Sequence, residues 1–511
     1  MVNSILLSLI VFSPLLAILI LAFVPRHQGG VIKQIGVLGT LLPLALSLML
    51  FAAFNYETAE PQFVESVKWI SIPIGFAQGG EMFTFDLDYE LGVDGVSMPL
   101  IVLTAIVGTL AAVASWQIKK RLKEYFILFH LLLIGMLGVF ASQNLFLFFI
   151  FFELTLVPTF FLIGIWGYGE RERAANKFLL YNGIGSAVML IAFIVLFVFL
   201  QTLNMEKIAT ILAAADHPAA AAMTPAFRFG LFLALFIAFA VKLPVFPFHT
   251  WMLKVHVQAP PAIVMIHSGI LLKMGAYGLL RMGIGFFPEQ AYQFAGWMAV
   301  LGLINILYGA VLAFVQKDLK MVLAYSSISH MGIVLLGFAA MNTIGFQGAM
   351  FQVVSHGFIS ALLFFLIGVI WERTQTSMIS ELGGLAKSMP FVSGILLAAG
   401  MASLGLPGMS GFISEFFAFL GLFGDMPVHA AIGTLGIVLT AAYLLRAILR
   451  TTFGPTPERL KGLADAQPME VVPMVVLLGF IILIGVYPAV LGNPMQQTLK
   501  TLVPIVTGIG G

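Results

Sequence analysis

The chain has 511 residues, of which 60% are hydrophobic and only 9% are charged, and its formal net charge is +2. Soluble domains carry about 25% charged residues, so this composition excludes an ordinary soluble protein and predicts an integral membrane protein with many spans. The small net charge gives no sign of a polyanionic partner. The chain has no cysteine, which excludes disulfides, thiolate iron–sulfur clusters and c-type haem attachment. It also has no GxGxxG or GxxxxGK[ST] motif, so we expect no cofactor in this chain.

Apolar stretches bounded by charged or turn residues predict about fourteen membrane-spanning segments. Lipid cannot satisfy backbone polar groups, so the spans must be helices, and the fold class is an all-α integral membrane protein. The expected spans are residues 4–25, 31–54, 96–117, 125–141, 145–167, 176–201, 228–250, 260–284, 291–315, 320–341, 345–371, 389–423, 429–451 and 471–491.

Basic residues are distributed unevenly between the loops. Eighteen of the 25 Lys and Arg residues follow odd-numbered spans, and five follow even-numbered spans or lie in the tail. The positive-inside rule then predicts that both termini lie on the outer, periplasmic side of a bacterial-type inner membrane. The long loop over residues 55–95 would also lie outside, and it is acidic.

Two of the predicted spans carry helix-breaking residues. The seventh contains Pro244 and Pro247, and the twelfth contains Pro407 between glycines. Broken helices at membrane depth are tolerated where they line a cavity or contact other protein. The breaks are five spans apart, an odd offset that inverts topology, so spans 4–8 and 9–13 are expected to be two inverted five-helix repeats with discontinuous helices 7 and 12.

The expected organisation is one polytopic membrane domain over residues 1–511. It divides into the N-terminal spans with the outer loop (1–124), a first repeat (125–284), a second repeat (290–452), and a last span with its tail (470–511).

Four ionisable residues lie inside apolar stretches, namely Glu153, Lys242, Lys273 and Glu415. A charge at membrane depth costs several kcal/mol, so these groups first suggest ion or proton movement. Burial disfavours the charged forms of Glu153 and Lys242, whereas an opposite charge nearby favours them. Bringing the two side chains together or moving them apart would therefore change whether Lys242 holds a proton. The alternative is a static salt bridge between two helices.

Lys273 lies near the middle of its span and suits a relay, although a lysine can also extend to the membrane surface. Glu415 follows the second break and could accept or release a proton, or cap the second half-helix, or both. Histidine titrates near neutral pH, and five histidines lie in or near the central spans: His249, His256, His267, His330 and His356. A single histidine there is more often a packing residue, but the cluster favours a relay, with His249, His330 and His356 as possible members. No spacing resembles HExxH, so a metal site is not expected.

Several motifs, in this order, resemble those of the antiporter-like membrane subunits of proton-pumping NADH:quinone oxidoreductase, respiratory complex I. The resemblance covers essentially the whole chain and is greatest to the subunit M group. The motifs are Phe152-Glu-Leu-Thr-Leu-Val-Pro158, Ala240-Val-Lys-Leu-Pro-Val-Phe-Pro-Phe-His-Thr-Trp251, Leu272-Lys-Met-Gly-Ala-Tyr-Gly-Leu-Leu-Arg281, Ala324-Tyr-Ser-Ser-Ile-Ser-His-Met-Gly332, Gly411-Phe-Ile-Ser-Glu-Phe416 and Leu91-Gly-Val-Asp-Gly-Val-Ser97.

The resemblance implies that Glu153 and Lys242 form a coupling pair, Lys273 is the central relay and Glu415 is the terminal site. It implies neighbouring antiporter-like subunits in a lipid bilayer, with FMN, iron–sulfur clusters and quinone carried by partner subunits and none by this chain. The chain would then be a subunit of an H+-translocating enzyme, with no redox chemistry of its own.

The sequence departs from the family pattern after the seventh span. The family usually reads Trp-Leu-Pro-x-Ala-His, whereas this chain reads Trp251-Met-Leu-Lys-Val-His256. Lys254 therefore puts the details of proton entry in doubt, and leaves Lys242 in place. The alternative functions are a subunit of a multisubunit cation/proton antiporter and a purely structural spacer, which would not need four buried ionisable groups.

Overall fold

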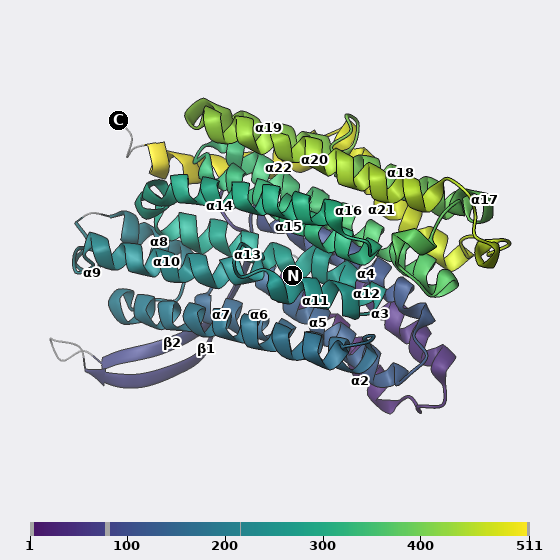
Figure 1. Ribbon diagram of the computed structural model, residues 1–511. Helices are drawn as coiled ribbons and strands as arrows, with labels where there is room; N and C mark the ends of the chain where they lie inside the picture. The colour runs from purple at the N-terminus through teal and green to yellow at the C-terminus, as the bar shows by residue number, and fades with distance from the viewer. Residues whose placement is uncertain (1–4, 77–81, 215, 508–511) are drawn as a thin grey trace.

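The computed structural model describes residues 5–76, 82–214 and 216–507, which form a bundle of helices running side by side (Figure 1). In the described chain, thirteen helices are long and apolar enough to cross a membrane. In the first half the principal helices are α1 (Leu6–Phe12), α2 (Pro14–Phe23), α3 (Gly29–Ala53), α4 (Ser97–Ala114), α5 (Leu122–Ala141), α6 (Leu145–Trp166), α7 (Arg171–Leu200), α10 (Pro225–Lys242), α11 (Thr250–Gln258), α12 (Pro261–Ile266) and α13 (Leu272–Gly278).

The second half continues the bundle with longer helices. Its principal helices are α14 (Pro288–Val315), α15 (Leu319–Ala339), α16 (Thr343–Thr374), α18 (Pro390–Ser403), α19 (Ser410–Asp425), α20 (Pro427–Thr452), α21 (Pro468–Val486) and α22 (Ala489–Thr507). Short helices α8 (Met205–Ala213), α9 (Pro218–Ala221) and α17 (Leu385–Ser388) lie in the connections.

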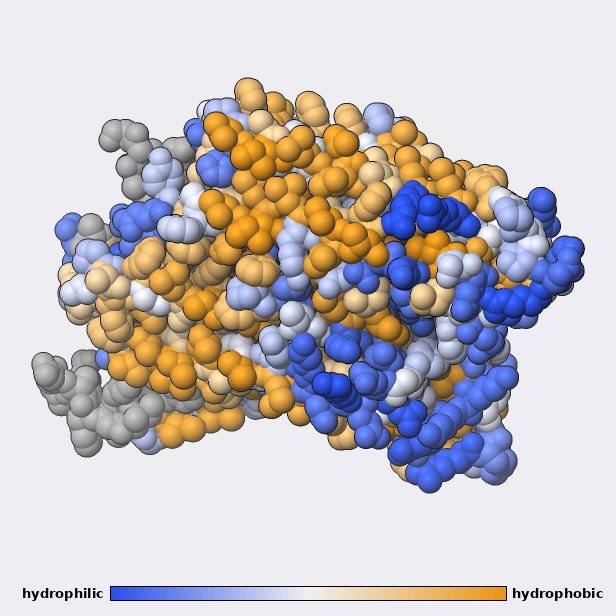
Figure 2. Space-filling view, in the orientation of Figure 1, coloured by the Kyte–Doolittle hydropathy of each residue, from blue (hydrophilic) through white to orange (hydrophobic). Residues whose placement is uncertain are grey.

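The surface carries the division expected of a membrane protein. Figure 2 shows hydrophobic residues along the sides of the helices and hydrophilic residues gathered at the right-hand end, near α17. Exposed large side chains on the helix sides include Leu180, Ile184 and Ile191 on α7. An apolar surface along the sides of the helices is favourable in contact with lipid and unfavourable in contact with water.

Both predicted helix interruptions are present. The seventh span ends at Lys242 and the chain resumes as α11 at Thr250, so the expected helix over 228–250 was too long at its end. The twelfth span divides into α18 and α19, with Gly405 (φ 80°) and Gly408 (φ 91°) between them. Pro407 cannot donate a helix hydrogen bond, and the glycines adopt conformations that other residues rarely accept.

The acidic outer loop is more ordered than expected. It forms an antiparallel hairpin of β1 (Gln62–Phe76) and β2 (Met82–Val93), the only sheet in the described chain, so the all-α description holds for the spans alone. Glu65 of β1 is buried and accepts the backbone N–H groups of Leu7 (2.8 Å) and Ser8. The first N–H groups of a helix lack internal partners, so Glu65 anchors the hairpin to the start of α1.

The residues after the last span also differ from the expected tail. They form the 19-residue helix α22. This helix packs against α16, α14 and α21, and Thr498 on it accepts the backbone N–H of Gly95 at 3.0 Å. The C-terminal helix is therefore hydrogen-bonded to the segment just before α4.

One backbone contact recurs at a fixed interval along the chain. The Leu145 N–H donates to the Leu203 carbonyl across the ends of α6 and α7, and the Leu319 N–H donates to the Ser377 carbonyl across the ends of α15 and α16, both at 2.8 Å. The second pair lies 174 positions after the first, from 145 to 319 and from 203 to 377. This correspondence supports the two-repeat organisation, which stays a prediction.

Candidate functional site

Lys242 lies at the first helix break and is buried, with 1% of its surface exposed. Its Nζ lies over the rings of Phe152 and Phe178, 5.0 and 5.5 Å from their centres. Within the described residues neither Lys242 Nζ nor Glu153 Oε1 has a hydrogen-bond partner, and the two side chains form no ion pair. They still interact electrostatically. The alternative of a static salt bridge therefore does not describe this structure.

Lys273 is fully buried on α13 between two π-helical stretches, His267–Leu271 and Leu279–Ile284. Wider helical turns of this kind occur often at functional sites. The Lys273 Nζ lies 2.6 Å from His356 Nδ1 and 3.9 Å from the Met331 sulfur. The depth and these contacts exclude an extension of Lys273 to the membrane surface.

His330 continues from His356 toward the second helix break. The two imidazole rings lie 5.5 Å apart. His330 Nε2 lies 2.8 Å from the carbonyl oxygen of Ser403, the last residue of α18, and Nδ1 lies 3.0 Å from the Ser326 carbonyl. Both neighbours are acceptors, so a neutral ring can donate to only one of them, while a doubly protonated ring can donate to both. The Ser403 hydroxyl lies 3.4 Å from Nε2 as a further partner, so His330 joins α15 to the end of α18.

Glu415 is buried on α19, just past the second break. A Cβ added to Gly405 would lie 2.5 Å from Glu415 Oε2, so the carboxylate rests directly against the interrupted backbone. Glu415 is the sixth residue of α19, beyond the first turn where a carboxylate would cap the helix. The capping alternative therefore does not fit this geometry.

A small polar cavity of about 10 Å³ lies between α15, α16 and the end of α18. Its polar lining is Ser326, Ser327, Ser360, Ser403 and His356. This volume is about the least that holds one water molecule. Tyr443 donates to Ser326 at 2.8 Å, so hydroxyl groups line this cavity alongside its apolar residues.

His249 lies at the start of α11, away from the other two expected relay histidines. Its Nε2 is 3.2 Å from the Tyr308 hydroxyl, and its ring stacks on Phe246. Lys254, the departure from the family pattern, lies on the surface with 46% of its side chain exposed, 3.4 Å from Glu170. The unusual lysine therefore forms an ion pair at the surface with Glu170 and, among the described residues, none with a buried group.

The sequence placed His256 and His267 among the central spans, but it did not predict that they pair and did not include them in the relay. The His256 Nε2 lies 3.0 Å from His267 Nδ1, and both residues are at most 1% exposed. The spacing of eleven residues spans two helices and a proline turn. Only the angle of that turn brings the rings together, so no sequence pattern indicated the contact.

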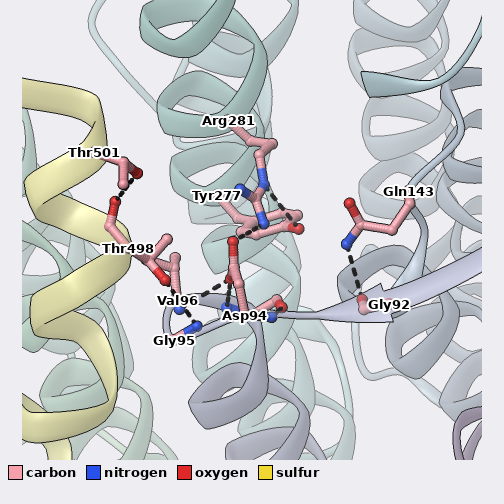
Figure 3. Close-up of polar contacts among 10 residues, drawn as sticks. Gly92, Asp94, Gly95, Val96, Gln143, Tyr277, Arg281, Thr498 and Thr501 are labelled. Carbon is pink, nitrogen blue, oxygen red and sulfur yellow. Dashed lines mark hydrogen bonds and ion pairs between the residues drawn. The ribbon is translucent and has the colours of Figure 1, made fainter. Parts of the chain in front are cut away.

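A second buried polar cluster lies near the end of the outer hairpin (Figure 3). Arg281 forms an ion pair with Asp94, whose side chain is 3% exposed, and Arg281 Nε donates to the Tyr277 hydroxyl at 3.4 Å. Asp94 also accepts the backbone N–H groups of Val96 and Ser97 at the start of α4. The pair borders a cavity of about 350 Å³ that Thr498 also lines. The sequence indicated Asp94 only as part of a motif.

No group of three or more His, Asp or Glu side chains in the described part of the chain is arranged to hold a metal ion. The buried groups described above are proton donors and acceptors with aromatic and hydroxyl neighbours. Such groups can exchange protons with one another without a cofactor in this chain.

Comparison with known families gives two matches that together span most of the chain. Residues 142–440 match the family described as "NADH:quinone oxidoreductase/Mrp antiporter, TM", and residues 37–140 match "NADH-ubiquinone oxidoreductase chain 4, amino terminus". The first match includes all seven residues proposed from the sequence as site residues.

Curated relatives and solved structures agree with these matches. The chain is 39% identical to NAD(P)H-quinone oxidoreductase chain 4 of Gloeobacter violaceus, covering 94% of this chain and 89% of the relative. It is 38% identical to NADH-quinone oxidoreductase subunit M of Rhodobacter capsulatus, covering 98% and 96%.

Among solved structures, a chain of respiratory complex I from Thermus thermophilus matches with a TM-score of 0.83 and 28% identity, covering 98% of this chain and 99% of that one. A chain of the Mrp complex from Dietzia matches with a TM-score of 0.82, covering 100% and 99%, but at 20% identity, which shows the fold alone.

Proposed function

The chain belongs to the subunit M (chain 4) family of NADH:quinone oxidoreductase, and we propose that Glu153, Lys242, Lys273 and Glu415 carry its protons. It is a multi-pass membrane protein, a proton-translocating subunit of the multisubunit complex I. The observation that best supports the proposed route is the buried series of contacts from Lys273 through His356 and His330 to the second helix break.

The first step uses the separated pair of Glu153 and Lys242. When they approach, each charge stabilises the other, and Lys242 holds its proton. When they separate, Lys242 loses that stabilisation in a desolvated site and releases its proton to the interior. Moving one charge through about 100 mV costs about 2.3 kcal/mol, which a change in a buried charge pair can supply.

The central step passes through Lys273 and two histidines. A proton on Lys273 Nζ transfers to His356 Nδ1, and Lys273 becomes neutral. His356 then passes a proton toward His330, directly or through one water in the polar cavity, and the two carbonyl acceptors of His330 stabilise its doubly protonated ring. His249 would serve a separate branch near Tyr308.

Glu415 is the terminal acceptor in this proposal. The break between α18 and α19 leaves carbonyl groups without helical partners, and the Ser403 carbonyl is one that His330 already contacts. A proton leaving His330 would protonate the Glu415 carboxylate. Release from Glu415 would then restore its charge and return the site to its starting state.

The larger setting follows from the family and the loop charges. We propose that the chain packs between other antiporter-like subunits in a bacterial-type inner membrane, with both termini outside. Partner subunits would carry FMN, iron–sulfur clusters and quinone. The antiporter alternative is supported by a likeness of fold and by a family description that covers both classes, whereas relatives at 37–40% identity carry quinone oxidoreductase names.

Replacement of the coupling pair tests the proposal. The variants Glu153→Ala and Lys242→Ala should assemble and lose proton pumping by at least about tenfold, since a positioned acid–base group typically contributes about 10²–10⁴-fold. Pumping is measured as quenching of a pH-sensitive dye in vesicles that contain the whole complex. The control Lys254→Ala removes an exposed lysine and should pump normally. Normal pumping by both assembled test variants would refute the role of the pair.

A further inference from the structure

A buried ion pair joins the helical segment that carries Lys273 to the start of α4 (Figure 3). Asp94 Oδ1 accepts the backbone N–H groups of Val96 and Ser97 at 3.0 and 2.9 Å, and Oδ2 accepts a hydrogen bond from Arg281. The sequence motifs that end at Ser97 and at Arg281 therefore meet at this pair. The proposed route uses Lys273 from the second motif and nothing from the first, so the contact between the motifs needs an explanation.

Arg281 lies inside the second π-helical stretch, Leu279–Ile284, which directly follows α13. A π-helix bonds each N–H to the carbonyl five residues back instead of four, and it is rare, so contacts outside the helix must favour it. If this stretch became α-helical, the segments on its two sides would rotate relative to each other by about 100°, the turn of one residue. Lys273 Nζ, now 2.6 Å from His356 Nδ1, would then turn away from its partner.

Two contacts fix this rotation from outside the helix. On the side of α13, Gly275 lies against the end of α10, where an added Cβ would be 2.6 Å from the Leu243 nitrogen and 2.9 Å from the Phe239 carbonyl oxygen. On the other side, Arg281 is held by Asp94, whose side chain is only 3% exposed. Since neither contact leaves room for the helix to turn, the residues between them adopt the wider winding.

A tyrosine connects the ion pair to the face of α13 that carries the lysine. Tyr277 is fully buried, and its ring packs on Phe140 with 5.3 Å between the centres. Its hydroxyl accepts a hydrogen bond from Arg281 Nε at 3.4 Å. Tyr277 and Lys273 are one helical turn apart, so they lie on the same face of α13. A displacement of the arginine would therefore reach the lysine through one turn of helix.

We propose that the Asp94–Arg281 pair is the anchor that sets the rotation of α13 and so holds Lys273 against His356. Arg281 is thus a positioning residue, which acts on the route through the helix. The inference rests on the proposed function, because Lys273 is the residue that is positioned. Asp94 directly follows strand β2, so the anchor also joins the outer hairpin to the helix of the central lysine.

Two substitutions loosen the anchor without leaving a buried charge alone. Arg281→Lys keeps a positive charge facing Asp94 but cannot reproduce the guanidinium's contacts with two partners. Tyr277→Phe removes the hydroxyl and keeps the ring. The matched control is Arg373→Lys, in another largely buried pair, with Glu470 at 2.6 Å. This control loses the same kind of contact, but in a pair that joins the last turn of α16 to α21.

Two measurements on the assembled complex separate positioning from folding. Pumping per mole of complex is measured in the dye-quench assay, and backbone hydrogen exchange of residues 272–284 is followed by mass spectrometry. We expect Arg281→Lys and Tyr277→Phe to lower pumping by at least about tenfold, since a misplacement of about 1 Å can cost about 100-fold. Exchange in that segment should become faster, because its winding is no longer held. Arg373→Lys should leave both measurements unchanged.

The outcomes distinguish the anchor from the route. Wild-type pumping by both test variants, with Lys273→Ala impaired, would overturn the anchor and leave the proposed function intact. An equal loss of pumping in Arg373→Lys would also overturn it, since any buried pair would then have the effect. If Arg281→Lys does not assemble, Tyr277→Phe decides alone. Normal pumping by Lys273→Ala would refute the proposed route itself.

Discussion

At the scale of single residues, the buried ionisable groups differ in what surrounds them. Lys242 has aromatic rings and a distant acid, whereas Lys273 has a histidine nitrogen within 2.6 Å. Glu415 rests against a glycine backbone. The charge of each group is therefore stabilised by different neighbours. A directional route needs such differences, because identical sites would hold a proton equally well.

The first residue-scale prediction concerns Glu415. The variant Glu415→Gln keeps the size and polarity of the side chain but cannot release a proton, so pumping should fall by at least about tenfold. Glu415→Asp keeps the carboxylate one methylene further back and should be impaired less. The dye-quench assay compares the two, and wild-type pumping by Glu415→Gln would contradict the terminal role.

A second residue-scale prediction concerns His330. His330→Gln can donate to the Ser403 carbonyl but cannot hold an additional proton. We expect assembly close to wild type with pumping reduced by at least about tenfold. Complex abundance and dye quenching, measured on the same vesicles, separate the two effects. Unchanged pumping would mean that His330 only ties α15 to the end of α18.

At the scale of elements, helix interruptions position the chemistry. Lys242 is the last residue of α10, and Ser403, the carbonyl partner of His330, is the last of α18. An unbroken helix would satisfy that carbonyl internally and leave it unavailable. The π-helical stretches on either side of Lys273 act similarly, since they alter the direction in which neighbouring side chains point.

An element-scale prediction follows for Gly405. Its φ of 80° disfavours a side chain, and a Cβ there would meet Glu415 Oε2. Gly405→Ala should destabilise the protein by about 1–2 kcal/mol and displace Glu415, lowering pumping. Thermal unfolding and dye quenching measure the two effects.

The matched control is Gly394→Ala, on the same broken helix. A Cβ at Gly394 meets nothing within 4 Å, and the residue lies inside α18, so alanine should be neutral or stabilising by about 0.5–1 kcal/mol. If both alanine variants behave alike, the break does not constrain Glu415 as described.

At the scale of the whole molecule, contacts distant in sequence hold the bundle together. The ion pair of Asp94 with Arg281 joins residues 187 positions apart, and Arg373 with Glu470 joins residues 97 apart at 2.6 Å. Both pairs are largely buried. The Gly95 N–H to Thr498 bond adds the C-terminal helix to the same cluster as Asp94 (Figure 3).

The whole-molecule prediction is that Asp94→Asn destabilises the fold. The substitution leaves the guanidinium of Arg281 buried without a countercharge, which typically costs about 3–5 kcal/mol. Thermal unfolding of the purified complex in detergent measures the loss. As a control, Glu381→Gln breaks an exposed pair with Arg459 and should cost no more than about 1 kcal/mol. Equal stability of the two variants would contradict a structural role for Asp94.

The sequence by itself determined the class of protein, the spans and both helix breaks. Membrane helices must be long, apolar and internally hydrogen-bonded, so their signal lies in consecutive residues. The positions of the four ionisable residues within the spans could be predicted for the same reason, and three of them, Lys242, Lys273 and Glu415, are buried. The outer hairpin and α22 were not predicted, since short-range composition does not distinguish a polar loop from a paired strand or a surface helix.

Only the tertiary structure decided which buried groups face one another. In the structure Glu153 and Lys242 form no hydrogen bond with each other, and Lys273 contacts His356. His249 contacts Tyr308, and His256 contacts His267. These contacts depend on the angles between helices and on wide helical turns, to which residues far apart in the sequence all contribute. The residues of the route can therefore be recognised in the sequence, whereas their order and contacts arise from packing.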